Sequence, residues 1–137
     1  MKIEQQVLSR EQMAHLAELG IDTSDASMMW YCCNKKWYLQ INNELSQGVA
    51  NVMNRAADFF VPTYTIGDLI EKLPSNIDGY GFKATIKKSP NYNYPWTEVV
   101  YDNEGVCTEY ITSKVNPIHA LYGFLCYVAK YHKELIK

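Results

Sequence analysis

The stretch SMMWYCCNKKWYLQI, residues 27–41, contains two aromatic-rich runs on either side of a short polar connection. Two such runs joined by a few polar residues predict a β-hairpin. In the second run apolar and more polar side chains alternate, which predicts one buried face and one face that is at least partly in contact with water. The apolar positions are Trp37, Leu39 and Ile41, and the positions between them are Tyr38 and Gln40.

Three further strands are expected on the C-terminal side of this hairpin, at 81–88, 96–101 and 106–112. In residues 81–88 apolar side chains alternate with lysine and threonine, which is the pattern of a half-buried strand. The connection between the last two strands ends in Gly105, and glycine is the residue that best tolerates the left-handed backbone of a hairpin loop. The last two strands are therefore expected to form a second hairpin.

Three helices are expected, at about 10–19, 66–73 and 117–133. Two of them begin with a capping box and the third with an Asn-Pro step, which are typical N-terminal signals. Residues 42–60 are less regular, and we expect a loop with short helical turns there. The signal residues are Ser9 with Gln12, Thr65 with Asp68, and Asn116 with Pro117.

The order of expected elements is therefore α-β-β-α-β-β-β-α. Because no βαβ alternation requires a parallel sheet, we expect an α+β fold with a mostly antiparallel sheet of about five strands and helices packed mainly on one face. The length of 137 residues suits one domain. No repeat, linker or change of composition marks a boundary, so a single domain over 1–137 is expected.

Composition and charge exclude several classes of protein. The chain has 13 Lys and Arg against 15 Asp and Glu and a net charge of −2, which argues against a strongly basic nucleic-acid binder. The N-terminus lacks the apolar core of a signal peptide, and no stretch approaches the ~20 apolar residues of a membrane-spanning helix. A cytoplasmic protein without a membrane anchor is expected.

No residue pattern predicts a metal site, a cofactor or a catalytic centre. The four cysteines include no CxxC pair and none opens a helix, so reduced thiols with a packing role are expected. Two acidic pairs in loops, Asp22 with Asp25 and Asp102 with Glu104, are explained by turn formation. We therefore assign no catalytic residue, and a small cysteine- or carboxylate-dependent hydrolase or transferase is kept as an alternative. The cysteines are Cys32, Cys33, Cys107 and Cys126.

The tyrosine content is high, with 11 Tyr beside 3 Trp and 4 Phe. Several of these aromatic residues fall on the second half of the expected sheet, and Tyr and Trp are enriched at protein interfaces. They form a candidate interaction surface for an unknown protein partner or for a second copy, unless the rings fold back over the sheet. Nearby lysines also allow a weak single-stranded nucleic-acid binder, which the acidic neighbours disfavour. The candidate residues are Tyr92, Tyr94, Trp96, Tyr101 and Tyr110.

Three segments carry a resemblance to other proteins: EQMAHLAELGIDTSDASM at 11–28, PTYTIGDLIEKLP at 62–74 and NPIHALY at 116–122. Together they resemble small proteins without an assigned activity that are encoded by Bacteroides-type gut bacteria and by their phages or integrated elements. The resemblance implies a phage or mobile-element setting and a cytoplasmic address, and it carries over no catalytic residue. Combined with the aromatic cluster, it leads us to expect a non-enzymatic protein-binding or adaptor module.

Overall fold

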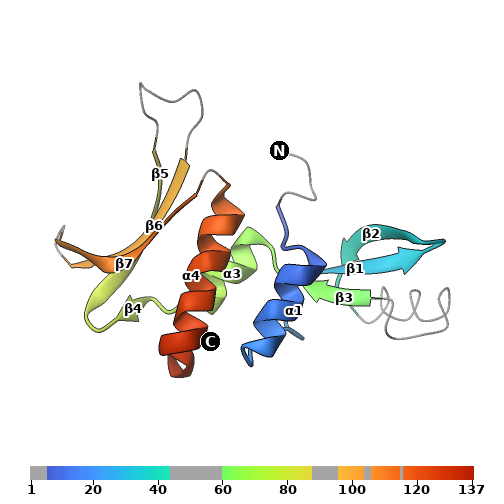
Figure 1. Cartoon of the computed structure of the whole chain (residues 1–137), viewed down its shortest axis with the longest axis horizontal. Coiled ribbons are helices and arrows are strands. Elements are labelled where there is room, and N and C mark those ends of the chain that lie inside the picture. Colours follow the sequence, from blue (N-terminus) through green and yellow to red (C-terminus); the bar gives the residue numbers. More distant parts are fainter. Residues whose placement is uncertain (1–5, 44–59, 88–95, 104–105, 115) are drawn as a thin grey trace. The chain divides into compact units, whose positions relative to one another are not determined.

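The computed structural model describes residues 6–43, 60–87, 96–103, 106–114 and 116–137. Of Cys33, Ile86, Lys87, Trp96 and 106–114 it describes the backbone alone. The chain divides into two compact units, an N-terminal unit of residues 1–68 and a C-terminal unit of residues 69–137. Each unit contains helix and an antiparallel sheet (Figure 1). The α+β class is confirmed, whereas the single domain over 1–137 stays a prediction.

The prediction of one sheet of about five strands is wrong, because the described strands form two sheets. One has three strands and lies in the N-terminal unit, and the other has four strands and lies in the C-terminal unit. The predicted element order therefore lacks two short strands, one at the end of the 42–60 region and one before 81–88. Strand partners are chosen by contacts between distant residues, so a local pattern does not tell how many sheets its strands will form.

The N-terminal sheet has the order β2-β1-β3 and is antiparallel throughout. Its strands are β1 (Met28–Cys33), β2 (Lys36–Ile41) and β3 (Phe60–Thr63). The predicted hairpin is confirmed as β1 and β2, whereas β3 replaces the predicted loop at residue 60. The loop predicted for 44–59 lies outside the described residues. Pro62 in β3 agrees with the position of this strand at one edge of the sheet, where a missing backbone donor is tolerated.

Helix α1 (Arg10–Glu18) packs against β3 and has the predicted signals at both ends. The Ser9 hydroxyl accepts from the Gln12 backbone N–H at 3.1 Å, and the Gln12 side chain accepts from the Ser9 N–H at 2.9 Å. At the other end Gly20 has a φ of 87°, and the N–H of Ile21 reaches the Leu16 carbonyl at 3.1 Å. These bonds satisfy backbone groups that the helix itself leaves without partners.

The C-terminal sheet has the order β4-β5-β6-β7, also antiparallel. Helix α4 packs against β6 and β7 and buries an almost continuous apolar stripe from Ile118 to Ala129. The hairpin predicted for the last two strands is confirmed, while Gly105 in its loop lies outside the described residues. The elements are β4 (Asn76–Ile77), β5 (Tyr80–Lys87), β6 (Trp96–Asn103), β7 (Val106–Lys114), α4 (Pro117–Tyr131) and the 3₁₀ turn η3 (Lys133–Leu135).

Helix α3 (Ile66–Lys72) contains the division between the two units, which falls after Asp68. Its predicted capping box is confirmed: the Asp68 N–H donates to the Thr65 hydroxyl at 3.1 Å, and the Thr65 N–H donates to the Asp68 carboxylate at 2.9 Å. The same carboxylate accepts from the Ser27 backbone N–H at 3.0 Å and from the Ser27 hydroxyl. Asp68 therefore also holds the start of β1. Among the described helices, none is both long and apolar enough to cross a membrane.

Candidate functional site

Of the five aromatic residues that the sequence grouped together, the structure describes the side chain of Tyr101 alone. Tyr92 and Tyr94 lie outside the described residues, and Trp96 and Tyr110 lie on β6 and β7 with only their backbone described. Tyr101 has an exposed fraction of 0%, so its assignment to an exposed surface is wrong. The surface formed by the other four residues stays a prediction.

Tyr101 is buried because β6 is an inner strand between β5 and β7 and α4 packs on it. The ring centroid lies 4.9 Å from that of Phe124 and 5.6 Å from that of Phe82. The hydroxyl donates to the Pro74 carbonyl oxygen at 2.6 Å, which satisfies the one polar atom of the buried ring. Burial raises the pKa of this hydroxyl. Tyr101 is thus a core residue of the C-terminal unit.

The cysteines whose side chains are described are poorly suited to nucleophilic catalysis. Cys32 is buried in β1, and Cys126 is half-buried on α4. Burial raises the pKa of the Cys126 thiol, against a smaller lowering by its hydrogen bond with Tyr122. Because the thiolate is the reactive form, a raised pKa makes Cys126 a weaker nucleophile at neutral pH. The side chains of Cys33 and Cys107 lie outside the described part.

The acidic pair Asp22 and Asp25 has the turn role that the sequence indicates. The Asp22 carboxylate accepts from the Ser24 N–H at 3.0 Å, which is an Asx turn. The buried hydroxyl of Tyr64 lies 2.9 Å from the Asp22 carbonyl oxygen and 3.0 Å from the Asp25 carboxylate. Among the residues the structure describes, no three acidic, His or Cys side chains form a group that could hold a metal ion. The second pair includes Glu104, which lies outside the described residues.

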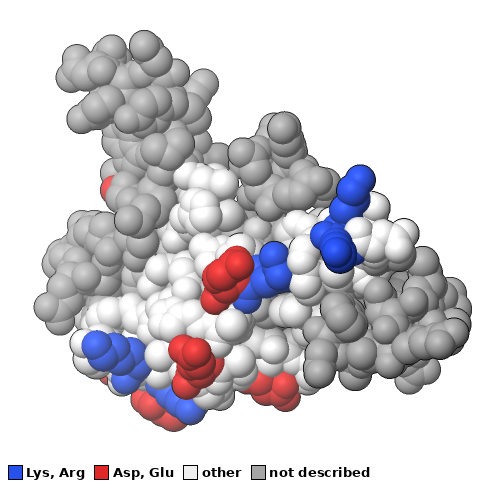
Figure 2. Space-filling view, turned by 45° about the vertical axis from the view of Figure 1, so that its right-hand side comes forward, with Lys and Arg blue, Asp and Glu red and all other residues white. Residues whose placement is uncertain are grey.

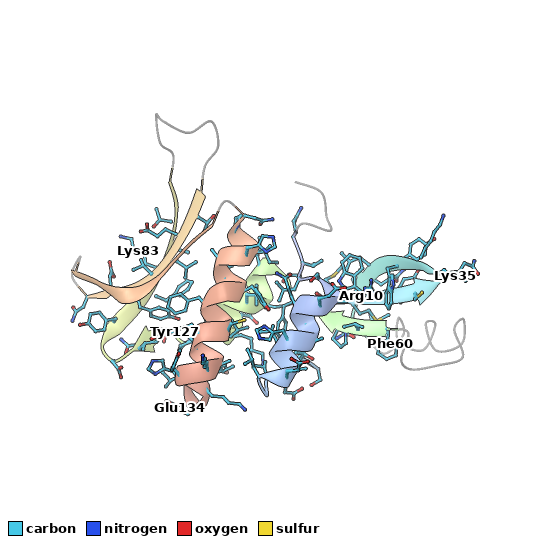
Figure 3. All side chains as sticks on the ribbon, in the orientation of Figure 1. Arg10, Lys35, Phe60, Lys83, Tyr127 and Glu134 are labelled. Carbon is cyan, nitrogen blue, oxygen red and sulfur yellow. The ribbon has the colours of Figure 1, made fainter. Side chains whose placement is uncertain are left out.

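The β1–β2 hairpin turns through two residues in the left-handed backbone region, Asn34 with φ 52° and Lys35 with φ 64°. Positive φ at both central positions defines the type I′ turn, whose twist matches that of the flanking strands. Asn tolerates this conformation better than other non-glycine residues, whereas Lys35 adopts it at a cost. The turn exposes the Lys35 side chain at the tip of the hairpin (Figure 3).

Strand β2 has one neighbour among the described strands, because the order β2-β1-β3 places it at the edge. Hydrogen-bonded and non-bonded pairs alternate along an antiparallel ladder. The Asn42 N–H donates to the Ser27 carbonyl at 2.9 Å, so Asn42 and Ser27 are a bonded pair. Counting back along the register makes Gln40 and Tyr38 bonded residues as well. The backbone groups of Trp37, Leu39 and Ile41 therefore point to the outer edge of the sheet.

This outer edge carries large side chains in contact with solvent. Tyr38 has an exposed fraction of 44% and Ile41 one of 61%, and Leu39 between them is half-buried. Tyr38 stacks on its cross-strand partner Tyr31, with ring centroids 5.4 Å apart and an interplanar angle of 28°. The stacking holds the Tyr38 ring in place while leaving part of it accessible. We call residues 35–41 the β2 edge surface.

Arg10 adds a positive charge to this surface. Its guanidinium carbon lies 3.9 Å from the centroid of the Trp37 ring, a cation–π contact of about 0.5–1 kcal/mol at a partly exposed site. The position of Arg10 follows from the chain just before it, because the Leu8 carbonyl accepts from the Trp30 indole at 3.0 Å and from the Thr63 hydroxyl at 2.6 Å. These bonds anchor the start of α1 to the sheet.

The hairpin differs in charge from the chain as a whole. Residues 28–43 contain two lysines and no acidic residue, whereas the chain has a net charge of −2. On the face that Figure 2 shows, Lys and Arg side chains are interspersed with Asp and Glu, and no continuous field of one charge covers the described residues in that view. The hairpin is therefore more basic than the chain as a whole.

Sequence reasoning found the hairpin but not the edge position of its second strand. It assigned Tyr31 and Tyr38 to the hairpin and predicted that one face of the second strand is at least partly wet and that the other face, formed by Trp37, Leu39 and Ile41, is buried. The prediction of a buried face is wrong, because Trp37 and Leu39 are half-buried and Ile41 has an exposed fraction of 61%. Sequence reasoning did not identify β2 as an edge strand, because that depends on β3 pairing with the other side of β1. The available signal was charge: Lys35 and Lys36 beside two aromatic runs is a pattern that edge strands commonly carry.

A comparison of the chain with protein-family models finds no match, and comparisons with curated proteins and with solved structures find none either.

Proposed function

We propose that this protein is a non-enzymatic binding module that recognises an extended segment of a partner protein. The segment adds to the N-terminal sheet as a further antiparallel strand along β2. In this mode backbone hydrogen bonds supply affinity, and side chains at alternate positions supply specificity. The observation that carries the proposal is the outer edge of β2, with the backbone groups of Trp37, Leu39 and Ile41 directed outward.

The exposed side chains support the same proposal. An exposed edge strand with large apolar residues invites pairing with another chain unless something covers it. Tyr38 and Ile41 flank the outward-directed Leu39, so an added strand buries apolar surface on both faces of the sheet. Full burial of an exposed side chain of this size is worth about 1.5–3 kcal/mol, and the exposed fractions of Tyr38 and Ile41 make part of that value available on binding.

The enzymatic and nucleic-acid alternatives have less support from the described residues. Cys126 has a raised thiol pKa, and Asp22 and Asp25 bond to the turn and to Tyr64. Stacking of nucleobases requires accessible ring faces. At the β2 edge surface Arg10 lies over Trp37, and Tyr38 has one face against Tyr31.

A phage or mobile-element origin also remains part of the proposal. It is tested by asking whether the genes that flank the coding sequence belong to a phage or a mobile element.

The proposal is tested by selecting binders of the full chain from a displayed library of random linear peptides of about eight to twelve residues. Ile41→Lys and Tyr38→Ser are expected to weaken the binding of the selected peptides by at least about tenfold, as for central interface residues. Ile70→Lys and Tyr131→Ser are matched controls, because these residues are also large and exposed, at 44% and 58%, but lie on α3 and α4. The proposal is contradicted if the control variants lose as much affinity for the selected peptides, or if the library yields no peptide that binds.

A further inference from the structure

The positive charges of the β2 edge surface lie at one end of the strand. Lys35 and Lys36 lie at the turn. Trp37 follows them in the sequence, and the Arg10 guanidinium lies over its ring. The other end of the strand carries no charge, since Leu39, Gln40 and Ile41 are followed by two asparagines. A strand that pairs along this edge thus meets a basic end and an apolar end.

We propose that the segment bound at β2 is acidic at its C-terminal end and apolar at its N-terminal end. This inference rests on the proposed function and specifies its partner. The acidic residues lie beside Lys36 and the apolar residues beside Leu39 and Ile41. Charge complementarity is the reason for the acidic residues, because the hairpin itself provides no acid to pair with its lysines.

The direction of the segment follows from the antiparallel ladders of this sheet. Both described pairings of β1, with β2 and with β3, are antiparallel. Antiparallel pairs are also slightly more stable per residue than parallel ones. Because β2 runs from Lys36 to Ile41, an antiparallel partner ends beside Lys36. Its C-terminal residues are therefore the ones next to the basic end.

A second copy of the chain is a poorer occupant of the same edge. Antiparallel pairing of β2 with β2 around Leu39 places Lys36 of each copy opposite Asn42 of the other, because the two positions are equally distant from the centre. Within the described residues 35–43 no acid lies opposite a lysine, and two hairpins of the same charge are brought together. The self-pair therefore leaves the basic end without a complement.

The test uses three peptides of about eight residues, long enough to span β2, with both ends blocked so that they carry no terminal charge. The first alternates valine and threonine and ends in two glutamates. The second has the same composition with the glutamates at its start, and the third has lysines in place of the glutamates. Each is titrated into the isotope-labelled full chain while the amide NMR signals of Trp37, Leu39 and Ile41 are followed.

The first peptide is expected to bind about fivefold tighter than the second and about tenfold tighter than the third at low salt. This preference is expected to shrink in high salt, which screens exposed charges. Lys36→Glu is expected to shrink the preference for the first peptide over the third, because it leaves Lys35 and Arg10 against one negative charge at this end. Lys130→Glu is the matched control, because Lys130 is an exposed lysine on α4, and this change is expected to leave the preference unchanged.

The outcomes separate the two proposals. If all three peptides shift the β2 signals with equal affinity, the acidic and directional preference is wrong while strand addition stands. If none of them shifts these signals and the chain remains a monomer, strand addition itself is contradicted. If the signals shift with protein concentration alone, the occupant is a second copy, and the proposal of an acidic segment is overturned.

Discussion

Tyr38 and Tyr101 lie in similar surroundings in the sequence and in opposite surroundings in the structure. Each is in a strand of an antiparallel hairpin, beside other aromatic or apolar residues. Tyr38 lies on the edge strand β2 and has an exposed fraction of 44%, whereas Tyr101 lies on the inner strand β6 and is fully buried. The position of a strand within its sheet, more than its composition, decides whether an aromatic side chain can meet a partner.

The largest expected difference between the two regions is in packing. Tyr101→Ala is expected to lower the free energy of unfolding by about 3–5 kcal/mol, as for other buried aromatic residues. Tyr38→Ala is expected to cost less than about 1 kcal/mol, because its ring makes one stacked contact with Tyr31 and is partly exposed. Urea denaturation of both variants measures the two values. If both variants lose a similar free energy of unfolding, the claimed difference between the edge strand and the inner strand is contradicted.

Proline substitutions distinguish the two strands by their backbone. Val99→Pro removes a ladder donor from β6, which is paired on both sides, and is expected to cost at least about 3 kcal/mol or to prevent folding of the unit. Leu39→Pro is expected to cost only about 1–2 kcal/mol, because the N–H of Leu39 points to the open edge. Circular dichroism during thermal unfolding measures both. An unfolded Leu39→Pro would show that this edge is already paired.

A buried hydroxyl in the N-terminal unit makes stability depend on pH. Burial first, and then the hydrogen bond to Asp25, raises the pKa of Tyr64 above its ordinary value of 10.0. Because the folded-state pKa is the higher one, this contribution is intact below about pH 10 and is lost as the pH rises further, by about 1.4 kcal/mol at about pH 11. Tyr64→Phe is expected to lose less stability than the wild type between about pH 9 and pH 11. If the free energy of unfolding falls with pH equally in the wild type and in Tyr64→Phe, this prediction is contradicted.

The smallest effect is expected at the turn of the β1–β2 hairpin. Lys35→Gly removes the cost of a left-handed backbone at Lys35 and is expected to stabilise the chain by about 0.5–1 kcal/mol. Asn42→Gly is a useful contrast, because Asn42 shows no positive φ and its side chain donates to the Ala26 carbonyl at 2.7 Å. That change is expected to destabilise. Thermal unfolding compares the two, and destabilisation by Lys35→Gly would argue against the type I′ turn.

Signals carried by neighbouring residues predicted the local structure well. The capping boxes at Ser9 and Thr65 depend on a residue three positions away, and the left-handed Gly20 depends on the helix directly before it. Such signals are complete in the sequence, because both interacting groups lie within a few residues of each other. The hairpins β1–β2 and β6–β7 were predicted for the same reason.

Properties that depend on distant residues were not predictable in the same way. The short strands β3 and β4 have four and two residues, too few to show a period of their own. The burial of Tyr101 follows from α4 and from the pairing of β5 with β6, neither of which is visible in residues near Tyr101. Tyr101 was assigned to an exposed surface for this reason, since it was judged by composition before the order of strands was known.

Amide hydrogen exchange along β2 tests the central claim, the openness of this edge to a partner strand, most directly. In the free chain the amides of Trp37, Leu39 and Ile41 are expected to exchange fast, while those of Tyr38 and Gln40, which bond to β1, exchange slowly. Addition of the peptide that ends in two glutamates is expected to slow the outward amides and leave the inward ones unchanged. Equal protection of Leu39 and Tyr38 in the free chain would contradict the account.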